Sequence, residues 1–243
     1  MKRAIFLVML GVCGAGLAPV EGWAQTSRQP AEVKYLRVPH RFQIFIDGGI
    51  GQPTEPGIFN DYWNTAFNFG LGFGVSIKPW LEVNASYNRT SFGLNAIEAK
   101  GRIHYTGIQE VQGGSVSTTV FSGSVRFLAV PKARTNPYVE IGVGAFSSKG
   151  EDVVIEDDNS DADDQPQVHN TMEDVNGISV WPAVGIQYAM SDRWSAYSRY
   201  TYMMNLNDKF APGDLLLPPG GGTPTIGGNQ VISSIIVGLM VRF

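Results

Sequence analysis

Hydrophobic residues alternate with small or polar residues over many stretches of this chain. Alternation with a period of two places successive side chains on opposite faces of a β-strand. Eight such stretches predict strands at about 41–50, 65–77, 81–91, 116–130, 137–147, 177–189, 194–205 and 231–243. The clearest is 65–77, where one face carries Phe67, Phe69, Leu71, Phe73, Val75 and Ile77. We therefore expect an all-β protein.

The stretch 65–77 also indicates which face of the sheet meets lipid. Ten residue steps of about 3.3 Å, tilted by about 40°, rise roughly 25 Å, which matches the apolar band of a membrane barrel. The opposite face is mostly glycine, with Gly70, Gly72 and Gly74, so an inward apolar face would leave the exterior bare. We expect the apolar face to point outward and the glycines to leave room inside.

The connections between the predicted strands alternate in length. Short connections lie at 78–80, 131–136 and 190–193, and long ones at 51–64, 92–115, 148–176 and 206–230. All the long connections of such a chain emerge from one end, as in outer-membrane barrels. The pattern predicts an eight-stranded antiparallel up-and-down transmembrane β-barrel with short periplasmic turns and long extracellular loops.

The first residues have the pattern of a signal peptide. Lys2 and Arg3 precede an apolar run at 4–18, and small residues surround a cleavage position after Ala24. We expect a signal peptide at 1–24, a periplasmic lead-in at 25–40 and the barrel at 41–243. Cys13 is the only cysteine and would be removed; Val12 before it is a poor match to a lipoprotein signal.

Three segments resemble a known family. Segment 136–146, segment 190–195 with 200–202 after it, and the closing strand 231–243 are similar to small eight-stranded outer-membrane proteins of the OmpA, OmpX, OmpW and opacity-protein type. The resemblance implies a bacterial outer-membrane location, contact with outer-membrane lipid and lipopolysaccharide, and a monomer. Because the sequence stops at Phe243, we expect the peptidoglycan-binding domain of full-length OmpA to be absent. It also implies that periplasmic chaperones and the barrel-assembly machinery are partners. The machinery would read the closing strand as an assembly signal at Val237, Leu239, Val241 and Phe243.

Charged residues occupy inward positions of the predicted barrel. Glu82 and Glu140 follow short turns and Arg126 precedes one, while Arg199 points inward if Trp194 marks the end of its strand. Eight strands enclose just enough space for side chains, and buried charges need partners. We predict that Glu82, Arg126, Glu140 and Arg199 form a charged, water-containing plug. A narrow or gated passage bounded by these residues is the alternative.

An acidic run at 151–174 contains oxygen ligands at every second residue. Asp157, Asn159, Asp161 and Asp163 have the spacing of a calcium loop, but Ala162 stands where the turn glycine belongs and Val168 replaces the bidentate glutamate. Acidic runs are more often simply solvated. Calcium is thus the one candidate cofactor, and general attraction of divalent cations or of cationic partners is the alternative.

Other chemistry finds little support in the sequence. Some eight-stranded outer-membrane proteins modify lipid A with a histidine, a serine and an acid, but His40, His104 and His169 do not lie beside a serine on a predicted strand. The net charge of −4 gives no basic face for nucleic acid. We expect no enzyme activity.

Aromatic residues gather near the predicted strand ends, where interfacial girdles lie. The expected girdle residues are Trp63, Trp80, Trp181, Trp194, Tyr62, Tyr87, Tyr188 and Tyr197. Pro182 falls within the strand 177–189 and predicts a β-bulge there. The expected function is structural or surface interaction through the loops. A narrow passive channel for small or apolar molecules, as in OmpW-like proteins, is the alternative, and a lipid-A-modifying enzyme is third.

Overall fold

The computed structural model describes residues 41–55, 57–95, 108–131, 133–157, 167–170, 174–206 and 229–243. The predicted signal peptide and lead-in, 1–40, lie outside these residues. Within the described part of the chain, no helix is long and apolar enough to cross a membrane.

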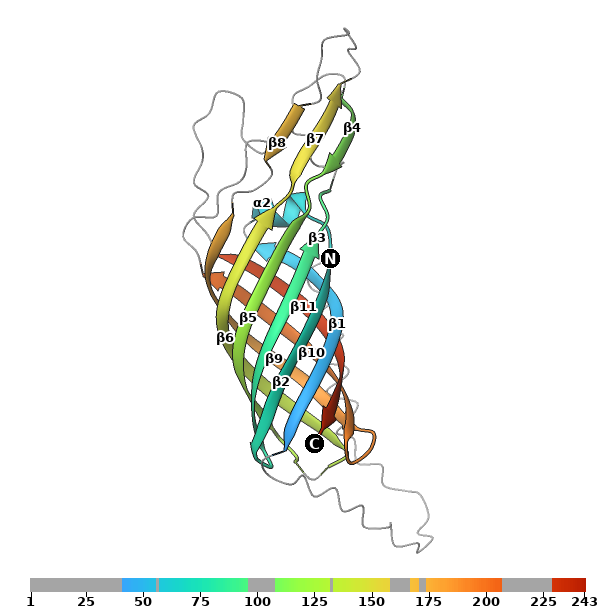
Figure 1. Ribbon diagram of the computed structural model, residues 1–243, viewed down its shortest axis with the longest axis vertical. Helices are drawn as coiled ribbons and strands as arrows, with labels where there is room; N and C mark the ends of the chain where they lie inside the picture. The colour runs from blue at the N-terminus through green and yellow to red at the C-terminus, as the bar shows by residue number, and fades with distance from the viewer. Residues whose placement is uncertain are drawn as a thin grey trace, which may run out of the picture. The chain divides into compact units, whose positions relative to one another are not determined.

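Eight antiparallel strands close into a barrel (Figure 1). Each strand pairs with its neighbours in chain order, and β1 pairs with β11 to close the wall. The predicted all-β up-and-down barrel is therefore confirmed. Its strands are β1 (Phe42–Glu55), β2 (Ala66–Lys78), β3 (Leu81–Phe92), β5 (Val116–Leu128), β6 (Thr135–Gly150), β9 (Val175–Ala189), β10 (Trp194–Leu206) and β11 (Gln230–Arg242).

The two ends of the barrel differ as the loop lengths predict. One end, which we call the short-turn end, carries the turns at 79–80, 129–134 and 190–193 together with the start of β1 and the end of β11. There the backbone N–H of Phe243 donates to the carbonyl of Phe42 at 2.9 Å. All four long connections leave from the opposite end, which we call the mouth (Figure 1).

The long connections contain structure that the sequence analysis treated as loop. The first holds a short helix, α2 (Gly57–Tyr62), and two others supply a second sheet ordered β4-β7-β8. Gly113 and Gly114 have φ angles of 84° and 75°, a conformation that favours glycine, at the point where β4 gives way to β5. The three strands of this sheet are β4 (Ile108–Gly113), β7 (Asp152–Asp157) and β8 (Gln167–Asn170).

This second sheet continues the barrel wall. Val116 of β5 pairs with Gly150 of β6, and beyond the glycine turn Gly113 of β4 pairs with Val153 of β7. The N–H of Gly114 donates to the carbonyl of Asp152 at 3.1 Å and bridges the two ladders. The β5–β6 hairpin therefore extends past the mouth.

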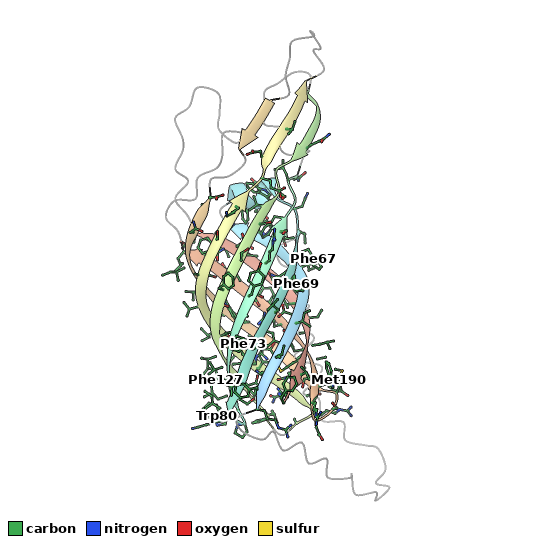
Figure 2. The ribbon with its side chains drawn as sticks, in the orientation of Figure 1. Phe67, Phe69, Phe73, Trp80, Phe127 and Met190 are labelled. Carbon is green, nitrogen blue, oxygen red and sulfur yellow. The ribbon has the colours of Figure 1, made fainter. Side chains whose placement is uncertain are left out.

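The apolar faces of the strands point outward, as predicted. Phe67, Leu71 and Phe73 are 66%, 49% and 64% exposed, whereas the alternate positions of β2 are buried. Figure 2 shows the labelled aromatic side chains projecting away from the wall. Large exposed apolar residues around a barrel whose buried face carries many polar side chains are typical of a protein surrounded by hydrocarbon.

The predicted aromatic girdle is only partly correct. Trp80, Tyr188 and Trp194 are exposed near the short-turn end, as girdle residues should be, but Trp63, Trp181 and Tyr197 lie inside the barrel. An aromatic residue near a strand end can be turned inward by its place in the alternation, which sequence position alone does not reveal. The side chain of Tyr62 lies outside the described residues, and Tyr87 is half-buried.

The predicted bulge at Pro182 is absent. Pro182 is exposed on the outer face and pairs in continuous register with Ile141 of β6. The pairing of β9 with β10 stops at Ala183 and resumes at Val180 without a register shift. The strand therefore accommodates the proline by omitting pairs rather than by adding a residue.

Candidate functional site

Six charged side chains point into the barrel and form one continuous cluster, which we call the charge chain. They come from β1, β3, β5, β6, β10 and β11, and all are buried. Three are carboxylates and three are guanidinium groups, so their formal charges cancel. The members are Asp47, Glu82, Arg126, Glu140, Arg199 and Arg242.

Arg126 occupies the centre of the charge chain. Its Nη2 lies 2.9 Å from Glu140 Oε2, and its Nη1 lies 3.5 Å from Glu82 Oε2. The register explains this arrangement, because Arg126 on β5 stands directly opposite Glu82 on β3 and Glu140 on β6. Ser124 Oγ donates to the other oxygen of Glu140 at 2.6 Å.

The charge chain continues from both carboxylates. Arg199 Nη1 lies 3.5 Å from Glu140 Oε2, and Arg199 Nη2 lies 3.1 Å from Asp47 Oδ2. At the other end, Arg242 Nη2 lies 3.0 Å from Glu82 Oε1. Positive and negative groups thus alternate, and each is paired, which is what burial of charge requires.

Aromatic rings support the two central arginines. The guanidinium carbon of Arg126 is 4.4 Å from the ring centroid of Tyr138 and 5.3 Å from that of Tyr197, and that of Arg199 is 5.4 Å from the ring of Trp181. Cations over ring faces are stabilised electrostatically, more so when water is excluded. The hydroxyl of Tyr197 donates to Asp47 Oδ2 at 2.6 Å, so the ring also joins the ionic network.

Small residues on the intervening strands allow the charged side chains to meet. Glu140 on β6 and Arg199 on β10 reach each other over β9, where their register partners are Ala183 and Gly185. Asp47 and Tyr197 meet in the same way over Gly238 of β11. The charge chain therefore depends on glycine and alanine positions that carry no charge themselves.

The glycines of β2 do not leave open space, contrary to the sequence-based expectation. A Cβ added at Gly72 would meet the ring of Phe45, and one at Gly74 would meet Asn84 Oδ1. Gln43 and Asn84 meet over Gly74, where Gln43 Nε2 donates to Asn84 Oδ1 at 2.7 Å. Side chains from both neighbouring strands fill the volume that these glycines vacate.

The same arrangement recurs around the barrel as cross-strand pairs of one glycine and one aromatic residue. In each pair the ring lies against the glycine directly opposite it in the register, a device that also shields the glycine backbone in curved sheets. The pairs are Phe45–Gly72, Tyr138–Gly185, Phe146–Gly177, Trp181–Gly142 and Tyr197–Gly238.

An apolar cluster fills the interior on the mouth side. The connection between β1 and β2 carries Phe59 and Trp63 into this cluster, and both are almost fully buried. Phe59 contacts the rings of Trp63 and Phe92, each with a centroid distance of 5.1 Å. Trp63 Nε1 donates to the carbonyl of Gly114 at 3.1 Å and ties the connection to the β4–β5 junction.

A hydrogen-bonded row crosses the interior near the apolar cluster. Thr118 and Ser148 are joined at 2.7 Å, Ser148 donates to Gln230 Oε1 at 3.1 Å, and Asn205 Nδ2 donates to the same oxygen at 2.7 Å. Ser148 on β6 and Gln230 on β11 are separated by β9 and β10 in the wall, so their bond spans the lumen. Charge chain, hydrogen-bonded row and apolar cluster together occupy the interior.

The structure brings together all four residues proposed for the plug, and it adds Asp47 and Arg242. Both additions stand at inward positions of the first and last strands, but their partners lie on other strands. Only the register of the closed wall shows that Arg242 reaches Glu82. The apolar residues of the proposed assembly signal, Val237, Leu239, Val241 and Phe243, face outward on and after β11.

The proposed calcium and histidine sites fall largely outside the described residues. Asn159, Asp161 and Asp163 are not described. Of Asp157, the last residue of β7, only the backbone is described. Among the described residues, no group of three or more histidine, cysteine or acidic residues could hold a metal ion. His40 and His104 are outside as well, and His169 is described only as backbone in β8.

No family model and no curated protein matches this chain. Among solved structures, Neisserial surface protein A is 12% identical, with a TM-score of 0.52 over 83% of this chain and 97% of that one. A major outer membrane protein from Thermus thermophilus is 8% identical, with a TM-score of 0.49 over 83% and 99%. The outer membrane protein OprG from Pseudomonas aeruginosa is 11% identical, with a TM-score of 0.44 over 84% and 97%.

The first of these similarities agrees with the topology described above. An apolar exterior around an interior that holds six buried, ion-paired side chains reverses the arrangement of a soluble protein and suits a bilayer. The chain therefore has the fold of the small eight-stranded outer-membrane β-barrel proteins, as its sequence predicts.

Proposed function

We propose that the protein is a sealed anchor in the bacterial outer membrane that acts through the connections at its mouth. The observation that carries the proposal is the charge chain, which links six of the eight strands across the interior. A barrel of eight strands has little interior space beyond its own side chains. The proposal assigns the lumen a structural role and no catalytic step.

The energetics of the charge chain support a closed lumen. A solute that passed the charge chain would have to separate ion pairs held at 2.9 to 3.5 Å. Leaving one buried charge without its partner costs about 3–5 kcal/mol. A polar solute would then meet the apolar cluster around Phe59 and Trp63, which offers it few hydrogen-bonding groups.

The mouth supports a surface role. The β4-β7-β8 sheet prolongs the β5–β6 hairpin past the barrel and presents edge strands there, and such edges can pair with another extended chain. The solved structure with a TM-score of 0.52 is called a surface protein, which agrees with this role at the level of fold analogy. Contact with lipopolysaccharide at this end belongs to the same proposal.

Conductance across a planar bilayer tests the sealed state. We expect the refolded barrel to give no steady single-channel current, while an open porin inserted in the same bilayer serves as the positive control. A reproducible current through the wild-type barrel, altered in Arg126→Ala, would favour the narrow passive channel and reject the sealed anchor.

The closing strand carries the outward apolar residues of the proposed assembly signal, so the proposal includes the barrel-assembly machinery as a partner. Leu239 and Phe243 project their side chains outward, where another protein can reach them during insertion. We expect Phe243→Ala to lower the amount of folded barrel in cells but not refolding of the purified chain in detergent. Phe42→Ala is the matched control, because Phe42 is 68% exposed at the same end and Phe243 is 67% exposed. Equal losses in cells from both variants would contradict the signal role.

A further inference from the structure

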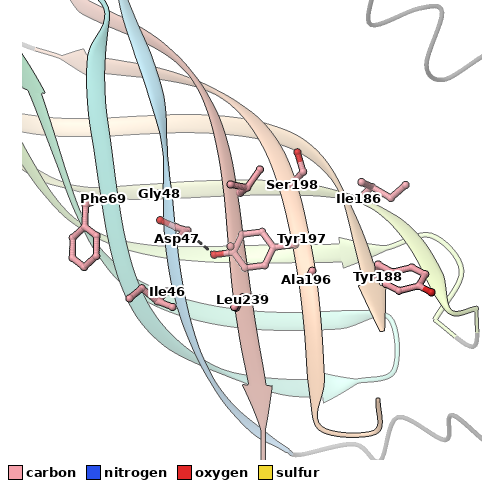
Figure 3. A pocket seen from close by; sticks show the side chains of 12 residues that line it. Ile46, Asp47, Gly48, Phe69, Ile186, Tyr188, Ala196, Tyr197, Ser198 and Leu239 are labelled. Atoms are coloured by element: carbon pink, nitrogen blue, oxygen red, sulfur yellow. Dashed lines mark hydrogen bonds between the residues drawn. The ribbon is translucent and has the colours of Figure 1, made fainter. Parts of the chain in front are cut away.

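The outer wall carries an apolar groove of about 640 Å³ (Figure 3). It crosses β9, β10, β11 and β1 on the face that meets lipid, and Phe69 of β2 closes one side. Its volume falls within the range of sites for small molecules, which are lined mainly by apolar groups. Hydrocarbon chains surround this wall, and two features of the groove favour one kind of lipid over the others.

Two small residues on the outer face of β10 line the groove. Ala196 of β10 lies between Tyr188 and Leu239, and Ser198 lies between Ile186 and Val237. Neighbouring strands are about 4.8 Å apart, so β9 and β11 flank a trough about 10 Å wide. A trough of this width between large apolar side chains accommodates one extended acyl chain.

The end of the groove toward the short turns is cationic. The ring of Tyr188 lines the groove, and the guanidinium carbon of Arg134 lies 4.9 Å from its centroid. Arg134 Nε donates to the carbonyl of Ala189 at 3.2 Å, which fixes the side chain beside the β9–β10 turn. Arg134 itself is exposed, so it can also meet a ligand.

Further arginines surround the same turn. Arg193 is exposed within it, and Arg41 Nη1 donates to the carbonyl of Asp192 at 3.4 Å. Counting Arg134, three guanidinium groups lie near this turn, and Asp192 is the one acidic side chain within its four residues, 190–193. The local field therefore favours an anion immediately beyond the apolar groove.

We propose that this groove binds one anionic glycerophospholipid from the leaflet at the short-turn end. One acyl chain lies over Ala196 and Ser198, and the phosphate contacts Arg134 and Arg193. The charge at the open end selects an anionic headgroup over a zwitterionic one. The choice between lipids rests on the proposed function, in which the mouth faces the cell exterior. The cationic end faces away from the mouth and therefore lies in the inner leaflet, so the occupant is a phospholipid rather than lipid A.

Native mass spectrometry of the whole barrel in an uncharged detergent tests the proposal. Phosphatidylglycerol, phosphatidylcholine with the same acyl chains, and lipid A are added separately, and the fraction of lipid-bound protein is measured for each. We expect the wild-type barrel to retain phosphatidylglycerol at a several-fold lower lipid concentration than phosphatidylcholine. Ala196→Phe and Ser198→Phe, each of which fills the trough, should each lower retention of both lipids several-fold.

Matched variants separate the groove from the rest of the wall. Ala145→Phe adds the same bulk at an exposed position of β6 outside the groove, and should leave retention unchanged. Arg134→Gln with Arg193→Gln should abolish the preference for phosphatidylglycerol, whereas Lys78→Gln should not, although Lys78 also lies over a ring, that of Trp80, at 5.4 Å.

Three results would overturn the proposal. Equal retention of the two phospholipids by wild-type barrel would remove the headgroup selection. An effect of Ala145→Phe as large as that of Ala196→Phe would show that bulk anywhere on the wall suffices. Stronger retention of lipid A than of phosphatidylglycerol would assign the site to the opposite leaflet.

Discussion

Arg126 and Glu140 stand opposite each other on β5 and β6, and Arg126 contacts Glu140 Oε2 through both Nε and Nη2, at 3.0 and 2.9 Å. Neither side chain is appreciably exposed. Both N–H groups converge on this one oxygen in charge-assisted hydrogen bonds, and the guanidinium group cannot rotate without lengthening one of them. The pair is the rigid centre from which the charge chain extends.

Removing the arginine of this pair should destabilise the barrel strongly. Arg126→Leu leaves Glu82 and Glu140 without their central partner, so we expect the free energy of unfolding to fall by about 3–5 kcal/mol. Urea unfolding of the refolded barrel measures the change. Lys149→Ala is the control, because its pair with Asp174 spans 3.7 Å with 69% and 60% exposure. Its removal should cost at most about 1 kcal/mol; equal losses would contradict our account of the charge chain.

The pairing of glycine with aromatic residues makes a second prediction. A Cβ at Gly142 would overlap the ring of Trp181, whereas one at Gly123 would meet nothing nearer than Asn84 O at 3.9 Å. We expect Gly142→Ala to cost about 1–3 kcal/mol of unfolding free energy through overpacking. Gly123→Ala should be neutral or slightly stabilising, since alanine suits a strand better than glycine. In the background of Trp181→Leu the penalty at Gly142 should shrink; an unchanged penalty would rule out the ring as its cause.

The outward face can be tested by placing a charge on it. Leu71→Arg puts a guanidinium on the exposed face of β2 among Ile46 and Tyr87, its register partners, and should cost about 2–4 kcal/mol if this is the bilayer midplane. Val130→Arg makes a similar change at an exposed residue of a short turn and should cost about 0–1 kcal/mol. Unfolding of the barrel refolded into lipid vesicles distinguishes the two. Equal costs would contradict the assignment of the Leu71 face of β2 to the lipid.

Cysteine labelling tests which end of the barrel faces the medium. Gln112 of β4 and Asp192 of the β9–β10 turn are exposed at opposite ends. In intact cells, a membrane-impermeant maleimide should label Gln112→Cys, whereas Asp192→Cys should react only after lysis. The unmodified protein controls for Cys13. Labelling of Asp192→Cys in intact cells would reverse the assignment of the mouth to the outside.

Alternation along the chain was sufficient to predict the barrel, its strands and its outward face. A single strand shows which residues share a face, so Glu82, Arg126 and Glu140 could be placed inside before any pairing was known. Asp47 was harder to find, because Gly48 and Gly49 interrupt the alternation immediately after it. Its partners, Tyr197 and Arg199, follow only from the order of strands around the closed wall.

The contents of the lumen could not be derived from alternation alone. A glycine at an inward position indicates missing volume, but whether that volume stays open depends on the residue opposite it. Gly72 faces Phe45 and Gly142 faces Trp181, and neither pairing is visible without the register. The inward turn of Trp63 is a further case, since the path of the connection between β1 and β2 places it.

Asp47 lies on the first strand of the barrel and Arg242 on the last, and each finds its opposite charge on a different strand. While the seam between β1 and β11 is open, the ends of the wall are apart and the two outermost contacts cannot form together. A barrel with an open seam would leave Asp47 and Arg242 in the membrane without their ion-pair partners, which is costly. Closure of the wall therefore supplies the ion-pair partners of the first and the last strand, while the four charges of β3, β5, β6 and β10 can pair without it.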